Sequence, residues 1–301
     1  VLGLGDSSYP LFNATGREVD ERLEALGARR LFARGEADVD VDPDFQGLPV
    51  EDYQGKVVLI EDLSPTIKHI RLELDRPMAF QAGQYINLHV PSIDSTRAFS
   101  IANPPSMSGI IDLHVRKVEG GAGTTWLHDE LQVGQSLDVS GPYGQFFVRK
   151  SDPQGAIFIA GGSGLSSPES MIMDLLEEGD TRPIYLFQGA RNKAELYHAD
   201  HFYQLAEKHD NFHYIPALNA PLPDDAWEGF VGFVHEAVGQ FFEQRCSGNK
   251  AYLCGPPPMI EAAISTLMQS RLFERDIHME QFLTAADGAT GKVRSALFKR
   301  I

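Results

Sequence analysis

The hydrophobic pattern of the sequence changes near residue 150, and this change limits the fold more than any other feature. In residues 51–150, short β-rich runs alternate with turn signals, a spacing that predicts a small antiparallel barrel or sandwich. In residues 151–286, strands alternate with helices, which predicts a parallel sheet wrapped by helices. We therefore predict a β domain followed by an α/β domain, with ligands bound at the carboxyl ends of the parallel strands.

The expected elements follow from these two patterns. In the first part, one helix is expected at Thr124–Gln132, directly after a glycine turn. The strands expected there are Lys56–Ile60, Ile67–Leu74, Tyr85–Val90, Ala98–Ile101, Ile110–Lys117 and Ser136–Ser140. In the second part, the expected strands are Ala156–Ala160, Ile184–Gln188, Phe212–Pro216 and Ala251–Cys254. The helices expected between and after them are Pro168–Leu176, Lys193–Glu207, His235–Gln244 and Met259–Gln269.

Both ends of the chain fall outside these two patterns. Residues 1–48 are predicted to form a separate segment. It has a short apolar strand, a polar loop and a helix that carries Val19, Leu23 and Leu26 on one face. Within this segment, Gly35–Pro49 is rich in Asp and predicts a linker. Residues 287–301 predict a C-terminal tail whose last residues are basic and apolar.

Composition excludes some classes of function. The formal charge of −16 argues against a nucleic-acid partner, which requires a basic stripe. The same charge fits electrostatic docking of a protein partner, and it fits solubility equally well. No apolar run approaches the roughly 20 residues that span a bilayer, and the first residues show no signal-peptide pattern.

The cysteine content is equally informative. The chain has two cysteines, Cys246 and Cys254, whereas a two-iron or four-iron cluster takes four thiolates in the usual case. Convergent Cys and His spacings of the zinc or Rieske type are also missing, so the sequence predicts neither an iron–sulfur cluster nor another metal site. A disulfide between the two stays open, but the low count favours a cytoplasmic protein.

Several short motifs follow one another in a defined order. First comes Arg97-Ala98-Phe99-Ser100, and a strand with a cationic end and a glycine-rich turn follow it. Next come the strand, turn and helix of IFIAGGSGLSS, and later the run CGPPPM. This order resembles that of the ferredoxin-NADP-reductase superfamily, which has a flavin barrel first and a nicotinamide-binding α/β domain second. The resemblance implies that FAD binds to the first domain.

The chemistry of the first motif suits a flavin dinucleotide. Arg97 can neutralise the pyrophosphate with its planar guanidinium, and Phe99 offers an aromatic plane beside the flavin ring or its ribityl chain. Ala98, between them, is expected to belong to the same site. Ser100 can hydrogen-bond the flavin near N5, although Phe99 replaces the more usual Tyr of this superfamily and loses a hydroxyl. The rest of the expected FAD site is His114, Val115, Arg116, Gly121, Gly123, Thr124 and Thr125.

The nicotinamide site is expected where the parallel strands end. The turn Gly161-Gly162-Ser163-Gly164 lets backbone N–H groups approach a pyrophosphate, although without a ligand it is also an ordinary strand-to-helix turn. The other expected nicotinamide contacts are Arg191, Cys254, Gly255, Pro256 and Met259. By resemblance, Ser100, Cys254 and Glu280 hold nicotinamide C4 over flavin N5, and Phe282 shields the flavin ring until the nicotinamide arrives.

Longer stretches narrow the resemblance. The phrases EDLSPTIK, RAFSIANPP, SGPYGQFFVRKS, AGGSGLSSP, KAYLCGPPPM and the RSALFKRI tail resemble the reductase component of phenol-hydroxylase-type monooxygenases, which act in the catabolism of aromatic compounds. Arg191 and Lys193 would suit a 2′-phosphate, so the residues alone leave NADH and NADPH open. The resemblance implies NADH as the electron donor and an oxygenase component or a separate carrier as the electron acceptor.

The N-terminal stretch departs from that family, whose members begin with a ferredoxin domain. Here GLGDSSYPLFN resembles the flavin-contacting loop of a flavodoxin-like FMN domain, in which Tyr9 would stack on the flavin. The phosphate-binding first strand and loop of such a domain are missing from this sequence. We therefore expect no FMN on this segment by itself.

Three functions remain in view. The first is an NADH-dependent FAD oxidoreductase that passes electrons to an oxygenase or carrier. The second is a diflavin-like reductase that serves a haem or other oxygenase, with FMN on a longer N-terminal domain. The third is a flavin-binding docking module without catalysis.

Overall fold

The computed structural model describes residues 2–5, 35–38 and 42–281. The chain divides into two units, residues 1–45 with 298–301, and residues 46–297. In the first unit, β1 (Leu2–Gly5) pairs in parallel with β2 (Gly35–Asp38). The short strand expected at the start of the chain is confirmed, but Gly35–Asp38 is a strand where the sequence predicted a linker. The expected N-terminal helix, Tyr9, Phe282 and the C-terminal tail lie outside the described residues.

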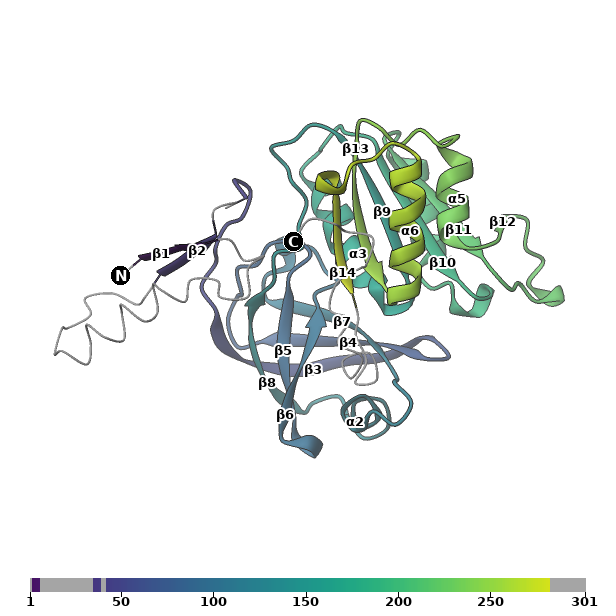
Figure 1. Ribbon diagram of the computed structural model, residues 1–301. Helices are drawn as coiled ribbons and strands as arrows, with labels where there is room; N and C mark the ends of the chain where they lie inside the picture. The colour runs from purple at the N-terminus through teal and green to yellow at the C-terminus, as the bar shows by residue number, and fades with distance from the viewer. Residues whose placement is uncertain (1, 6–34, 39–41, 282–301) are drawn as a thin grey trace. The chain divides into compact units, whose positions relative to one another are not determined.

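The first domain of the larger unit is a six-stranded antiparallel sheet with the order β6-β5-β8-β3-β4-β7 (Figure 1). Its strands are β3 (Glu51–Ser64), β4 (Ile67–Leu74), β5 (Tyr85–Val90), β6 (Ser95–Ser100), β7 (Ile110–Arg116) and β8 (Ser136–Tyr143). The longest strand, β3, pairs with β8 through its first half and with β4 along most of its length. Register shifts near Val57 and Asp62 bend it, because a bulge increases the local twist of a strand.

The two ends of this sheet approach each other through Asn103, which follows β6. The Asn103 side chain accepts a hydrogen bond from the backbone N–H of Asp112 on β7 at 2.8 Å and donates one to the Ile110 carbonyl at 2.9 Å. The backbone N–H of Ala102 also donates to the Asp112 carbonyl at 2.9 Å. These bonds bring the outer strands β6 and β7 together, so that the sheet curls into the predicted barrel around a buried apolar core.

Helix α2 (Ala122–Asp129) packs on the barrel with Leu127 fully buried. It begins two residues before the expected start at Thr124, because the chain leaves its extended conformation at Gly121. The preceding residue, Gly120, has a φ of +71°, a conformation that glycine adopts without steric cost. The turn therefore places the N-terminus of α2 at the edge of the barrel.

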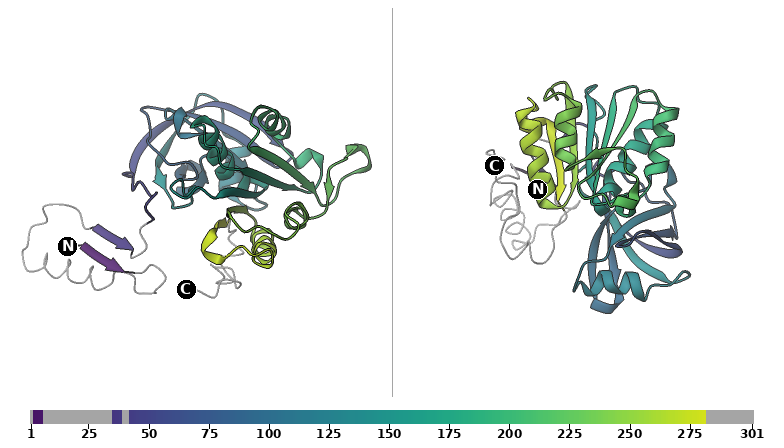
Figure 2. Two further views of the ribbon diagram at one scale, coloured as in Figure 1. Left: turned by 90° about the horizontal axis from the view of Figure 1, so that it is seen from above. Right: turned by 90° about the vertical axis from the view of Figure 1, so that its right-hand side faces the viewer.

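The second domain is a six-stranded parallel sheet with the order β12-β11-β10-β9-β13-β14. Its strands are β9 (Gly155–Gly161), β10 (Ile184–Ala190), β11 (Phe212–Leu218), β12 (Phe230–Val231), β13 (Asn249–Gly255) and β14 (Ile277–Gln281). Its helices are α3 (Ser166–Glu177), α4 (Ala199–Lys208), α5 (Val234–Phe241) and α6 (Pro257–Gln269). Helices α5 and α6 pack together on one face and α3 and α4 cover the other (Figure 2), so the central strand β9 is buried throughout.

The structure corrects several expected bounds in this domain. The single helix expected at Lys193–Glu207 is a short 3₁₀ turn, Lys193–Glu195, followed by α4. The break falls at His198, whose φ of +59° is left-handed and cannot continue a right-handed helix. Strands β12 and β14 were not predicted, because β12 has two residues and β14 is a short edge strand of five.

The barrel and the parallel sheet share a hydrophobic core. Ile67, Phe146 and Val148 of the barrel domain belong to the same buried cluster as Phe158 and Tyr252 of the sheet. Polar contacts follow the same boundary, since Ser170 Oγ donates to the Asn103 carbonyl at 2.7 Å and the Arg149 N–H donates to Tyr252 Oη at 3.0 Å. The side chains where the two domains meet are therefore held on both sides.

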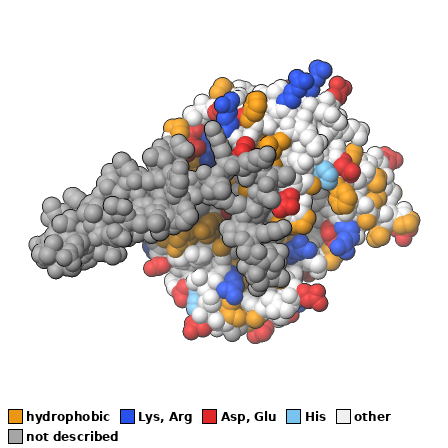
Figure 3. Space-filling model, viewed as in Figure 1, with side chains coloured by type: hydrophobic (Ala, Val, Ile, Leu, Met, Phe, Trp, Pro, Cys, Tyr) orange, Lys and Arg blue, Asp and Glu red, His pale blue; other side chains and the backbone are white. Residues whose placement is uncertain are grey.

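The described surface is mixed in character. Figure 3 shows acidic and basic side chains interspersed over the described part of one face. Among the described residues, no helix combines the length and the apolar character needed to cross a bilayer.

Candidate functional site

A carboxylate on the edge strand β14 is the centre of the candidate site. Glu280 Oε2 accepts hydrogen bonds from Ser100 Oγ at 3.1 Å and from Ser167 Oγ at 3.0 Å. Cys254 Sγ lies 3.8 Å from the same oxygen and donates to it. The donors come from β6, α3 and β13, so that one oxygen atom links the barrel to the parallel sheet. The structure thus brings together Ser100, Cys254 and Glu280, as the sequence predicted.

Strand register explains this convergence. Strands β13 and β14 pair in parallel with Cys254 opposite Glu280, so their side chains emerge on the same face of the sheet. Ser100 is the last residue of β6 and is buried, and Ser167 lies in the first turn of α3 and is fully buried. Each side chain therefore stands at the end of a regular element, where its position is fixed by the backbone.

Burial controls the protonation of this cluster. It raises the pKa of Glu280, and the hydrogen bonds from the two serines and the cysteine offset only part of that rise. Burial also raises the pKa of Cys254 well above its ordinary value, and the neighbouring Glu280 charge adds to this effect. Cys254 is therefore a neutral thiol that donates a weak hydrogen bond. Both cysteines are free, so the disulfide that the sequence left open does not form.

Ser167 was not among the expected site residues. It lies in the run Leu165-Ser166-Ser167, directly after the glycine turn that was singled out for pyrophosphate. The available signal was a pair of serines in the buried first turn of the helix that follows the glycine turn. Its partner Glu280 is far away in sequence, which hid the contact.

Of the expected pyrophosphate contacts on the barrel, Arg97 and the first turn of α2 lie together. Arg97 is exposed, and its Nη1 donates to Ser95 Oγ at 3.1 Å and to the Thr96 carbonyl at 2.8 Å. Its aliphatic stem passes Gly123 in the first turn of α2, where an added Cβ would lie 3.7 Å from Arg97 Cγ and 3.1 Å from Ile93 Cδ1. A guanidinium beside a helix N-terminus is an arrangement that attracts anions. The residues present fit the diphosphate of a dinucleotide.

The other expected flavin contacts separate into different surroundings. Ala98 is exposed, and Phe99 is half-buried and packs on the barrel core. The Thr124 hydroxyl donates to the Gly121 carbonyl at 3.2 Å and accepts from the Val118 N–H at 3.1 Å, so it closes its own turn. The Thr125 N–H likewise donates to the Gly121 carbonyl at 2.9 Å.

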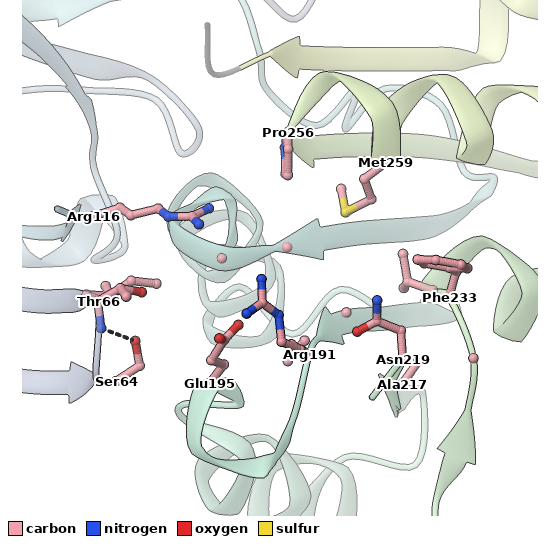
Figure 4. Close-up of a pocket in the computed structure, with 17 residues that line it drawn as sticks. Ser64, Thr66, Arg116, Arg191, Glu195, Ala217, Asn219, Phe233, Pro256 and Met259 are labelled. Carbon is pink, nitrogen blue, oxygen red and sulfur yellow. Dashed lines mark hydrogen bonds between the residues drawn. The ribbon is translucent and has the colours of Figure 1, made fainter. Parts of the chain in front are cut away.

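The side chains of the strand end His114-Val115-Arg116 lie in different surroundings. His114 and Val115 are buried, whereas Arg116 is exposed. Arg116 points into a pocket at the carboxyl ends of the parallel strands, and Gly162 lies beside it (Figure 4). Arg116 thus lines the pocket at the ends of the parallel strands, whereas His114 lies in the interior.

This pocket has a volume of about 220 Å³. Of the expected nicotinamide contacts, Gly161, Gly162, Arg191, Pro256 and Met259 line it. Figure 4 shows Arg116 and Arg191 pointing into it, with Glu195 next to Arg191. The lining residues that sequence reasoning missed are Ser64, Thr66, Ile67, Gly189, Ala190, Glu195, Ala217, Asn219, Gly232, Phe233 and Val234. Most of them follow strand ends, as the rule for parallel sheets predicts.

The other residues that were predicted for the nicotinamide site do not line the pocket but belong to the turns next to it. Ser163 and Gly164 are buried in a 3₁₀ turn after β9. A Cβ at Gly164 would lie 2.4 Å from the Cys254 carbonyl oxygen, so only glycine permits this approach to β13. Gly255 has a φ of +152°, and a Cβ there would lie 2.7 Å from Met259 Cε.

Comparisons with known proteins agree with this architecture. The oxidoreductase FAD-binding domain family matches residues 54–148, and the oxidoreductase NAD-binding domain family matches residues 158–264. The phenol hydroxylase P5 protein of Acinetobacter pittii (strain PHEA-2) is 71% identical over 266 residues, which cover 88% of this chain and 75% of that protein. The chain belongs to the phenol hydroxylase reductase family. It is therefore an NAD(P)H-dependent FAD oxidoreductase.

Further relatives show the range of the family. The reductase component DmpP of phenol 2-monooxygenase from Pseudomonas sp. (strain CF600) is 66% identical, with the same coverage of 88% of this chain and 75% of that protein. The crystal structure of the Amycolatopsis cytochrome P450 reductase GcoB has a TM-score of 0.75 and 32% identity, covering 85% of this chain and 77% of that one. The flavodoxin family matches residues 1–51, which bears out the flavodoxin-like resemblance of the N-terminal segment.

Proposed function

We propose that this chain oxidises NADH and passes the electrons through FAD to an oxygenase component. The observation that supports this most directly is the cluster of Ser100, Cys254 and Glu280, because it joins the end of a barrel strand to the ends of two parallel strands. A site for transfer between two bound cofactors has to lie at such a junction. FAD, when bound, supplies the capacity to accept one hydride and to release its two electrons singly.

The chain's own contribution is position and charge. We propose that Arg97 and the N-terminus of α2 bind the diphosphate of FAD, with Ala98 and Phe99 beside the flavin and Ser100 at its reactive edge. The Ser100 hydroxyl is already held by Glu280, which limits its rotation. Cys254 and Glu280 would then orient the nicotinamide, and the buried carboxyl would keep water away from the transfer site. Orientation of this kind makes a large contribution to rate.

For the electron donor, we propose NADH rather than NADPH. Glu195 lines the pocket beside Arg191, and a carboxylate there would repel a 2′-phosphate. Lys193, which was a candidate for that phosphate, instead donates from Nζ to the Asp225 carbonyl at 3.3 Å. Arg116 and Arg191 remain available for the pyrophosphate that NADH and NADPH share.

For the acceptor, we propose the oxygenase component of a multicomponent monooxygenase in the cytoplasm. The support is the role of the relatives, which are components of phenol hydroxylase and of phenol 2-monooxygenase. We also propose that this sequence carries no iron–sulfur cluster, because its two cysteines are half the usual number of ligands.

A second candidate is a diflavin-like reductase for a haem oxygenase. Two observations favour it, the flavodoxin match over residues 1–51 and the likeness to a cytochrome P450 reductase. It requires FMN on a flavodoxin-like domain, of which residues 1–51 match a part.

One experiment tests these proposals together. The purified chain is titrated anaerobically with NADH and with NADPH, its visible spectrum is followed, and the released flavin is identified. Bleaching of FAD by about one equivalent of NADH, with NADPH much slower, is the expected result. Release of FMN beside FAD would favour the diflavin candidate. FAD that stays oxidised with both donors would overturn the reductase proposal and favour the docking module.

A further inference from the structure

A second group of ionisable side chains lies where the barrel and the parallel sheet meet. His114 is on β7 of the barrel, Glu169 is on α3, and His198 directly precedes α4. Among the residues that the structure describes, they form one group of three His, Cys, Asp or Glu side chains whose ligand atoms all lie within 4.8 Å of one another. None of the three lines the nicotinamide pocket or contacts Glu280 through a hydrogen bond.

The hydrogen bonds of Tyr197 fix the tautomer of His114. Tyr197 Oη donates its single proton to the Gly162 carbonyl at 3.0 Å. His114 Nδ1 lies 3.3 Å from the same oxygen and must therefore be the donor in that contact. In a neutral imidazole, Nε2 then carries a lone pair and no proton.

The unprotonated nitrogen faces a carboxylate. His114 Nε2 lies 4.0 Å from Glu169 Oε2, which is beyond hydrogen-bond length and offers no proton to share. Two acceptors that face each other in the interior are unfavourable unless a cation lies between them. The His114 side chain is 2% exposed and that of Glu169 12%, so bulk water does little to screen this contact.

His198 completes the group from the outside. Its Nδ1 lies 3.0 Å from Glu169 Oε1 and 3.1 Å from Oε2. The His198 side chain is 25% exposed, which leaves a route for an ion from solvent. Its backbone is left-handed, an uncommon conformation for a residue other than glycine that persists only where the surroundings hold it.

We propose that His114 Nε2, the Glu169 carboxylate and an imidazole nitrogen of His198 bind one divalent transition-metal ion, of which Zn²⁺ is the best fit. Imidazole and carboxylate ligands bind Zn²⁺ at about 2.0–2.2 Å, so that two ligand atoms of one tetrahedral ion lie roughly 3.3 Å apart. The contacts of 3.0 Å and 4.0 Å around Glu169 bracket that separation. The set of two imidazoles and one carboxylate is a known ligand set for such ions, with water at the open position.

The role of this ion would be structural. It would fasten β7 of the barrel to α3 and to the start of α4, and so hold the two domains in one arrangement. Ser167 lies two residues before Glu169 on the same helix, so the ion would also stabilise the element that orients Glu280. If His198 binds through Nδ1, the proton that it now donates to Glu169 leaves when the metal binds.

The direct test measures Zn²⁺ bound to the full chain with its FAD. The protein is treated with a chelator, dialysed against Zn²⁺ with a competing chelator dye, and assayed for metal by mass spectrometry. The variants are Glu169→Gln and His198→Ala, and FAD content checks that each is folded. His213→Ala is the matched control, because His213 is an exposed histidine on β11 that stacks on Tyr185 with 5.0 Å between ring centroids.

The proposal predicts one Zn²⁺ per wild-type chain and unchanged binding in H213A. Both ligand variants should bind Zn²⁺ about 100-fold more weakly or worse, since outer contacts alone are worth roughly 10- to 100-fold. Zinc-edge X-ray absorption should show nitrogen and oxygen neighbours only. Three results would each overturn the proposal. The first is that the wild type binds none of Zn²⁺, Co²⁺ and Ni²⁺ stoichiometrically. The others are that E169Q and H198A bind Zn²⁺ as tightly as the wild type, or that a sulfur ligand is seen. These readouts do not depend on activity, so they also separate this proposal from that of the reductase function.

Discussion

Two half-buried carboxylates lie where the barrel meets the parallel sheet, and their surroundings shift their pKa values in opposite directions. Burial raises the pKa of Glu280, and its hydroxyl and thiol donors offset this only in part. Burial acts the same way on Glu169, but the hydrogen bond from His198 and the electrostatic effect of the neighbouring histidines outweigh it and hold the pKa below its ordinary value. The groups that contact each carboxyl, more than how deeply it is buried, therefore decide which of the two keeps its charge.

The comparison also separates two kinds of task. The Glu280 cluster consists of small neutral donors that fix one oxygen at the ends of parallel strands, where ligands bind. The Glu169 cluster consists of imidazoles in the interior, away from the nicotinamide pocket. The first arrangement suits orientation of a substrate, and the second suits a cation.

The largest expected effect is that of Glu280→Gln on turnover. The amide has nearly the same shape but no charge, so both its acceptance from Ser100 and its contact with the nicotinamide change. We expect NADH-dependent turnover to fall about 100-fold, as a small misplacement of reacting groups does. Steady-state NADH oxidation with an artificial electron acceptor measures this. Glu261→Gln, at an exposed carboxylate on α6, is the control. A fall of less than about threefold would contradict the role of Glu280.

The second effect is that of Glu169→Gln on stability in chelator-treated protein. The amide oxygen still accepts from His198, but the hydrogen bond loses its charge. We expect the free energy of unfolding to fall by about 1–2 kcal/mol. Urea unfolding followed by fluorescence provides the number. Glu177→Gln changes an exposed residue on the same helix and should be neutral. Equal loss in both variants would contradict the comparison.

A smaller effect is expected from Ser167→Ala. The change removes one of the donors that lower the pKa of Glu280, so this pKa should rise further. We expect a loss in the rate of FAD reduction by NADH of about tenfold or less. The pH profile of that rate should also move toward higher pH. In Ser166→Ala, the lost hydroxyl bonds the Ser163 carbonyl and not Glu280, so this profile should stay in place.

The smallest effect is the pH dependence of stability in Glu280→Gln. A raised pKa in the folded state means that the wild type loses stability as pH rises from the ordinary carboxyl range through the raised value. The glutamine variant has no such loss. Its thermal midpoint should therefore exceed that of the wild type by a few degrees at pH 8, and the gap should close toward pH 4. A gap that widens at low pH would reverse the sign of the pKa shift.

Much of the fold could be predicted because it depends on local pattern. The bounds of β4 and β5 agree with the expected Ile67–Leu74 and Tyr85–Val90, since apolar alternation over most of β4 and all of β5, together with the flanking turns, marks both ends. The meeting of Cys254, Ser100 and Glu280 was expected from family resemblance, and the register of β13 and β14 explains it. Strand β14 itself was missed because a short edge strand has a weak pattern.

What could not be predicted depends on contacts across the domain boundary. His114 was grouped with Arg116 as a flavin contact, but His114 is buried inside β7, whereas Arg116 is the exposed last residue of the strand and lines the pocket. No metal site was expected, since His114, Glu169 and His198 come from three distant elements with no motif spacing. Ser167 donates a hydrogen bond to Glu280, which lies 113 residues later in the sequence, so no local pattern connects the two.

The most direct test is the single-turnover rate of FAD reduction by NADH, measured anaerobically across pH in the wild type and in Glu280→Gln. The account predicts that the wild-type rate changes as a group with a pKa above the ordinary carboxyl range titrates. In the variant, with FAD still bound, the rate should be low and flat across that range. A variant with the rate and pH profile of the wild type would contradict the central claim that Glu280 lies at the site of hydride transfer.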